Sequence, residues 1–136
     1  MKKTLFIALS ILLVIFCLNS FKPSNKKSNK LIGIWVRSEF GYLTAKYVKS
    51  DSLKENEPGF EFKEDGKLII RQNIGWCGTP PVKYGNYNGT WHFISNNTLR
   101  LNHDNWRGKV ERDLKIIKLT DKNIELKSIT YMSKEK

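Results

Sequence analysis

An alternation of apolar and polar residues runs from about residue 31 almost to the end of this chain of 136 residues. In FEFKEDGKLII, residues 60–70, apolar side chains occupy every second position on both sides of an Asp-Gly turn. A repeat of two is typical of antiparallel strands, because successive side chains point to opposite faces of a sheet. Helical periodicity is nearly absent after residue 30, and only residues 44–57 have room for a turn or two of helix. The sequence therefore predicts an all-β domain.

The loops fix the register of the strands, because residues paired across an antiparallel ladder point to the same side. A three-residue loop over residues 64–66 pairs Phe62 with Leu68 and puts glycine third, where a left-handed bulge residue is needed. The next pair on this face is Phe60 with Ile70. A two-residue turn would instead send Leu68 to the wrong side of the sheet.

A second hairpin follows the same rule. A three-residue loop over residues 95–97 pairs Phe93 with Leu99, and its last residue, an asparagine, takes the left-handed conformation that this residue type tolerates. Trp91 then pairs with Leu101.

The last hairpin has a four-residue loop over residues 120–123, which pairs Leu119 with Ile124. Ile117 then pairs with Leu126. The apolar residues before Ile117 are out of phase with this face, which predicts a bulge between residues 116 and 117.

Two more strands are expected near residues 31–40 and 42–48, which gives about eight or nine strands. No crossover helices separate them. A meander of this size either closes into an up-and-down barrel or folds into a sandwich.

The first 20 residues are typical of an export signal. Lys2 and Lys3 precede an uncharged, strongly apolar run over residues 4–18. The run is short for a membrane-spanning helix, which needs about 20 apolar residues. Residues 21–30 are rich in Lys, Ser and Asn and predict a flexible linker. The folded domain is therefore expected over residues 31–136.

Cys17, at the end of the apolar run, allows three interpretations. It is lipidated as in a bacterial lipoprotein, although the bulky Phe16 matches that signal poorly, or it is removed by cleavage near Ser20, or the segment remains as an uncleaved anchor. The expected location is the periplasm, the outer membrane as a lipoprotein, or the exterior. Contact with a membrane is expected only through the N-terminal segment.

The positive charge of the chain lies largely outside the expected domain. The formal net charge is +11, but six lysines and no acids fall in the first 30 residues, which leaves 18 basic and 13 acidic side chains after them. A nucleic-acid-binding domain more often keeps a clustered basic surface interleaved with aromatic residues. The remaining lysines are scattered, so no nucleic-acid partner is expected.

The segment NKLIGIWV, residues 29–36, resembles the Gly-x-Trp opening of the lipocalin superfamily. FEFKEDGKL, WCGTPPVKYGNYNGTWHF, NNTLRLN and IIKLTDKNIEL are similar to small exported lipocalin-like domains of bacterial envelopes, and the likeness spans roughly residues 31–129. The resemblance implies an antiparallel up-and-down barrel of about eight to nine strands, preceded by an N-terminal signal helix. It also implies that the interior either encloses an apolar ligand or is filled.

In lipocalins a tryptophan caps the closed end of the barrel, and the resemblance gives this role to Trp35. An arginine from a late strand usually packs over that tryptophan. The last hairpin offers Lys118 and Lys127 but no arginine, and Arg112 is the nearest candidate.

The Gly-x-Trp spacing occurs twice, at Gly33 and Trp35 and again at Gly89 and Trp91. We expect both glycines to leave space where another backbone or ring comes close, with the tryptophans filling the barrel.

Two groups of residues are candidates for binding. The expected barrel interior is either a packed core or a pocket for a small hydrophobic ligand. The loop over residues 75–85 and a later hairpin tip offer aromatic rim residues that either contact a partner or only cover an edge. The interior candidates are Phe60, Phe62, Trp91, Phe93, Leu99 and Leu101, and the rim candidates are Trp76, Cys77, Tyr84 and Trp106.

No motif for catalysis, a metal or a cofactor is recognisable. The chain has no Gly-x-Ser-x-Gly, no paired-cysteine metal motif and no phosphate loop, and neither His92 nor His103 has a second ligand at metal spacing. We therefore expect a non-enzymatic exported barrel of unassigned role, which either binds a small hydrophobic ligand in the cell envelope or acts as an envelope accessory. The alternatives are a protein-interaction or inhibitor module that uses the rim aromatics on an envelope protein, and an enzyme with an unrecognised site.

Overall fold

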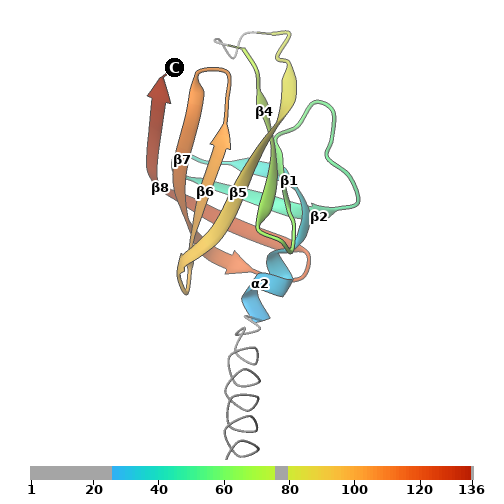
Figure 1. Cartoon of the computed structure of the whole chain (residues 1–136). Coiled ribbons are helices and arrows are strands. Elements are labelled where there is room, and N and C mark those ends of the chain that lie inside the picture. The colour runs from blue at the N-terminus through green and yellow to red at the C-terminus, as the bar shows by residue number, and fades with distance from the viewer. Residues whose placement is uncertain (1–25, 76–79, 136) are drawn as a thin grey trace, which may run out of the picture.

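The computed structural model describes residues 26–75 and 80–135, which form one short helix and eight antiparallel strands closed into a barrel. Helix α2 lies at one end of the barrel (Figure 1). The prediction of an all-β antiparallel barrel is confirmed. The elements are α2 (Lys26–Leu31), β1 (Gly33–Phe40), β2 (Thr44–Ser50), β3 (Gly59–Phe62), β4 (Lys67–Asn73), β5 (Tyr84–Ser95), β6 (Thr98–Asp104), β7 (Gly108–Leu119) and β8 (Asn123–Glu135).

The strand order differs from the up-and-down order that the resemblance implied. Strands β3 to β8 form a meander, but the β1–β2 hairpin joins it the other way round, with β1 paired to β3 and β2 paired to β8. The connection over residues 51–58 must therefore pass β1 to reach its other edge. Arg71 of β4 holds this connection through Nε and Nη2, which donate to the carbonyl oxygen of Glu55 at 3.1 and 2.6 Å. The up-and-down prediction is wrong because the register argument orders strands only within each hairpin.

The first hairpin has the predicted register. Phe62 pairs with Leu68 and Phe60 with Ile70. Gly66 has a φ of 79°, the left-handed conformation expected at the third loop position.

The second and third hairpins are confirmed in part. Phe93 pairs with Leu99 and Trp91 with Leu101, but Ser95 pairs with Thr98. The turn is therefore only two residues long, and the register shift between Phe93 and Ser95 takes up the extra residue. The left-handed asparagine predicted at residue 97 is wrong, because within the described residues only glycines have a positive φ.

In the third hairpin Leu119 pairs with Ile124 as predicted, but Leu126 pairs with Ile116 rather than with Ile117. The bulge lies at Ile117, whose side chain turns outward and is 49% exposed. This shift keeps Ile116 on the inner face.

Helix α2 occupies the last part of the segment expected to be a flexible linker. Its final residue, Leu31, is fully buried in the barrel core, and the indole Nε1 of Trp35 donates to the carbonyl oxygen of Leu31 at 2.7 Å. Burial of this leucine anchors the helix across the end of the barrel.

The half of the barrel next to α2 is filled by side chains. A series of aromatic contacts leads into this half from Tyr47 and Phe60, with ring centroids 5.0 Å apart for Tyr47 and Phe60, 5.5 Å for Phe60 and Phe62, and 5.5 Å for Phe62 and Trp91. Aromatic pairs at these separations stabilise a core beyond the area that they bury. Other buried side chains of this core are Leu31, Trp35, Leu68, Leu99, Leu101 and Ile124.

The two glycines of the Gly-x-Trp pairs lie against neighbouring strands. A Cβ on Gly89 would lie 2.3 Å from the carbonyl oxygen of Asn102 and 2.7 Å from Cβ of His103. Gly33 has a φ of 119°, and a Cβ there would lie 2.8 Å from Cε of Lys49. Both positions therefore exclude a larger residue.

Candidate functional site

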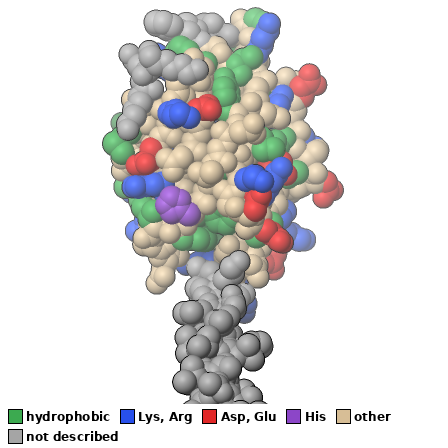
Figure 2. Space-filling model, in the orientation of Figure 1, with side chains coloured by type: hydrophobic (Ala, Val, Ile, Leu, Met, Phe, Trp, Pro, Cys, Tyr) green, Lys and Arg blue, Asp and Glu red, His purple; other side chains and the backbone are tan. Residues whose placement is uncertain are grey.

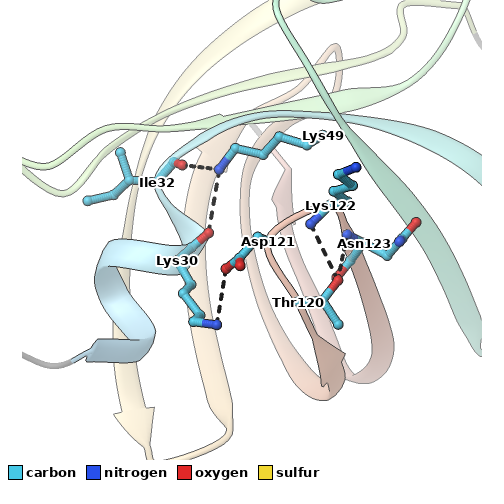
Figure 3. A network of polar contacts seen from close by, with 7 residues as sticks. All are labelled: Lys30, Ile32, Lys49, Thr120, Asp121, Lys122 and Asn123. Atoms are coloured by element: carbon cyan, nitrogen blue, oxygen red, sulfur yellow. Dashed lines mark hydrogen bonds and ion pairs between the residues drawn. The ribbon is translucent and has the colours of Figure 1, made fainter.

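The closed end of the barrel is held by a polar network between α2, β2 and the β7–β8 turn (Figure 3). The ammonium group of Lys49 donates to the carbonyl oxygens of Ile32 and Lys30, and Lys30 forms an ion pair with Asp121 at 3.0 Å. With the bond from Trp35 to Leu31, these contacts supply donors to the carbonyl groups of the last two residues of the helix, Lys30 and Leu31, which have no partner within it.

Lys49 also supplies the cation over Trp35. Its Nζ lies 4.5 Å from the centroid of the Trp35 ring. Partial burial lowers the pKa of Lys49, and Asp121 acts in the opposite direction. Arg112, the nearest candidate for the arginine that packs over this tryptophan in lipocalins, borders the opposite, open half of the barrel instead.

The open half of the barrel contains a cavity of about 640 Å³. Its apolar wall is formed by side chains that point inward from four strands, and its mouth lies between the β1–β2 hairpin, the connection before β3 and the start of β5. The apolar wall residues are Phe60, Ile70, Leu114 and Leu126.

One side of the cavity is cationic. Arg37 of β1 and Arg112 of β7 both border the cavity, beside the buried Tyr47 of β2. Burial raises the pKa of the Tyr47 hydroxyl, while Arg112 and Arg37 both act to lower it, so both guanidinium groups lie within electrostatic reach of that hydroxyl.

Neither arginine has an acidic partner among the described residues. Arg37 stacks on Phe40 at 4.9 Å and Arg112 lies over Tyr131 at 5.8 Å, measured from the guanidinium carbon to the ring centroid. Nε of Arg112 is buried and has no hydrogen-bond partner within residues 26–75 and 80–135. No Asp or Glu is among the described residues that border the cavity.

His103 is buried inside the barrel wall with a relative exposure of 5%. Its Nδ1 lies 2.8 Å from the carbonyl oxygen of Asp104, and its Nε2 has no partner in the described part of the chain. Burial lowers the pKa of His103, and the charge of Arg112 lowers it further, whereas Asp104 raises it. His92 lies on the outer face, so the two histidines do not meet in a common cleft.

The six interior candidates do not all border the cavity. Phe60 does, whereas Phe62, Trp91, Leu99 and Leu101 pack in the filled half, with Phe93 half-buried against them. The barrel is thus partly filled and partly hollow. Sequence reasoning missed the cavity residues Arg37, Tyr47, Arg112, Leu114 and Leu126, although each inward position follows from alternation along its strand.

The rim candidates are separated. Tyr84 borders the cavity, and Trp106 is 40% exposed in the β6–β7 turn, where its ring lies 4.5 Å from the guanidinium carbon of Arg107. Trp76 and Cys77 lie outside the described residues.

A second hollow, of about 580 Å³, borders Asn88, Thr90, Asn102 and Glu111. These positions alternate with inward-facing core residues, so their side chains belong to the outer face of the sheet. Most of the lining therefore belongs to the outer face, and His103 and Val110, at inward-facing positions, also border the hollow.

The face of the molecule in Figure 2 shows no strong concentration of one charge. On the face in Figure 2, Lys and Arg side chains lie beside Asp and Glu side chains and form no continuous basic patch. Within the described ranges, no group of His, Cys, Asp and Glu is arranged to hold a metal ion. None of the described helices is long and apolar enough to cross a membrane.

No protein-family model, curated protein or solved structure matches this chain.

Proposed function

We propose that this chain is an exported, lipocalin-like barrel that binds a small hydrophobic ligand in the cell envelope. The cavity of about 640 Å³ carries this proposal, because ligand pockets commonly measure about 300–1,000 Å³ and have mainly apolar walls. Export is supported by the charged and apolar N-terminal sequence, with Cys17 as the candidate for lipidation. The lipocalin-like assignment is supported by the opening Gly33-x-Trp35 motif and by the closure of eight antiparallel strands into a barrel, while the reversed β1–β2 hairpin departs from the up-and-down order of lipocalins.

The test is binding of N-phenyl-1-naphthylamine, a neutral apolar dye, to the purified full chain, followed by fluorescence. We expect saturable binding to one site. Ala45 borders the cavity, so Ala45→Phe should weaken binding by filling the space. Val48→Phe adds the same ring to the outer face of the same strand, where Val48 is 39% exposed, and should leave binding unchanged. Absence of saturable binding, or equal effects of the two substitutions, would contradict the proposal.

A protein-interaction module is the second candidate, favoured by one surface feature. The tip of the β1–β2 hairpin exposes Phe40 by 74%, Tyr42 by 95% and Leu43 by 49%. Large apolar side chains grouped on a surface often mark an interaction site. A photo-crosslinking residue at position 42 should then give an adduct of one defined mass in intact cells. The same residue at Lys54, on an exposed loop, should not. Similar products at both positions would argue against the module.

A further inference from the structure

The positive charge on one side of the cavity restricts the class of ligand that can bind there. This inference rests on the proposed function, because it requires that the cavity hold a ligand. Three arginines border the cavity, and its described lining contains no carboxylate. Arg71 already donates to Oδ1 of Asn86 and to the carbonyl oxygen of Glu55, whereas Arg37 and Arg112 have no acidic partner among the described residues. A guanidinium group withdrawn from water is costly unless it is paired or hydrogen-bonded. The cavity therefore favours an anion as the missing partner.

Three side chains converge on this position from three strands. Arg37 and Tyr47 are direct partners across the β1–β2 ladder, and Arg112 projects from β7 on the inner face. All three side chains border the same cavity. The hydroxyl and the guanidinium groups are all donors, so the arrangement suits an acceptor with two oxygens.

The orphaned donor gives independent support. Nε of Arg112 is buried without a partner in the described residues, although the large majority of buried side-chain polar atoms have one. The guanidinium carbon of Arg112 also lies 5.8 Å from the centroid of the Tyr131 ring. The planar fork of a guanidinium group matches a carboxylate, which accepts two parallel hydrogen bonds.

We propose that the cavity selects amphiphiles with a carboxylate head group, which binds between Arg112, Arg37 and the Tyr47 hydroxyl. The alkyl tail lies against the apolar wall formed by Phe60, Ile70, Leu114 and Leu126. Long-chain fatty acids have this chemistry. A neutral lipid of the same shape leaves the arginines without a partner and binds more weakly.

The test compares cis-parinaric acid with its methyl ester, which has the same tail and no charge, on the full chain at neutral pH. Loss of a hydrogen bond to a charged group corresponds to roughly a 10- to 100-fold change in affinity. The acid should bind more tightly than the ester by a factor in this range. Arg112→Met should reduce the affinity for the acid to that for the ester and leave the ester unaffected.

Lys115→Met is the matched control, because Lys115 is an exposed residue of the same strand and its loss changes the net charge equally. It should leave acid binding unchanged. Arg37→Met is a second variant in case Arg112→Met does not fold. Equal binding of acid and ester by the unaltered chain, or equal losses with Arg112→Met and Lys115→Met, overturns the carboxylate proposal. If N-phenyl-1-naphthylamine still binds in that case, the hydrophobic cavity stands; if no probe binds, both proposals fail.

Discussion

Lys49 lies over the ring of Trp35, with its ammonium nitrogen 4.5 Å from the ring centroid, and donates to two carbonyl oxygens at the end of α2. One side chain therefore closes the filled end of the barrel and holds the helix on it. Lys49 belongs to β2 and is the direct ladder partner of Trp35 in β1. The β1–β2 register therefore sets this contact.

The first prediction concerns this contact. Lys49→Met keeps the aliphatic stem but removes the charge and the two donors. It should lower the free energy of unfolding by about 1–2 kcal/mol, since a cation over an aromatic ring and a cation at a helix C-terminus each stabilise by about 0.5–1 kcal/mol. Urea unfolding followed by tryptophan fluorescence measures the change. Lys127→Met, at an exposed position of β8, is the control and should have little effect. Equal unfolding midpoints for the two variants would contradict this role of Lys49.

The second prediction concerns Gly89. A methyl group at this position would lie 2.3 Å from the carbonyl oxygen of Asn102, so one of the two strands must move. Gly89→Ala should cost about 1–3 kcal/mol of stability, the usual range for overpacking a core. Thermal unfolding by circular dichroism checks this, with Asn88→Ala as the control at an exposed neighbouring position. A stability loss no larger than that of the control would show that β5 and β6 have room to separate.

The faces of the hairpins could be predicted from the sequence because they depend on local rules. Phe62 must oppose Leu68 if both are buried, and the loop length then follows. The bulges were harder to locate. Ile94 and Ile117 lie at register shifts and are exposed by 44% and 49%, although their apolar character alone favours burial.

The strand order and the cavity could not be predicted in the same way. A reversed β1–β2 hairpin still gives antiparallel pairing at both of its edges, so the residue pattern is the same for either order. The eight-residue connection DSLKENEP was the available signal, because it is longer than a hairpin needs. The sequence pattern led us to expect aromatic residues around the ligand, but most of these residues pack in the filled half of the barrel next to α2. The cavity lies instead beside Arg37 and Arg112. Both residues occupy inward positions, but a charged side chain is ordinarily expected to face the solvent, so the sequence did not indicate that they line the interior.

The third prediction is a pH dependence of stability that arises from His103. The pKa of His103 in the folded chain lies below the ordinary value of 6.5. Burial and the charge of Arg112 lower this pKa, and Asp104 partly offsets them by raising it. The unfolded chain therefore binds more protons, and the contribution of His103 is complete above pH 6.5 and is lost as the pH falls below it. Asp113, whose pKa is lowered from 3.8 by Arg100, loses its contribution only at more acidic pH.

The free energy of unfolding should therefore decrease as the pH is lowered from 6.5 towards 5. His103→Gln removes the titrating group and should flatten this decrease, whereas His92→Gln, at the exposed histidine, should preserve it. Urea titrations at several pH values supply the measurement. An unchanged slope in His103→Gln would assign the effect to other groups.

The last prediction tests the strand order directly. Lys46 of β2 is the ladder partner of Glu125 of β8, whereas an up-and-down barrel would place β2 beside β3. Cysteines at positions 46 and 125 should therefore form a disulfide under mild oxidation, because partners across a ladder lie within about 4.5–5.5 Å between Cα atoms, close enough for the bond. Cysteines at positions 46 and 61 should not, since Glu61 of β3 pairs with Ile34 of β1. Peptide mapping by mass spectrometry identifies the linked pair despite the native cysteines. A 46–61 link without a 46–125 link would restore the up-and-down order and move the wall of the cavity with it.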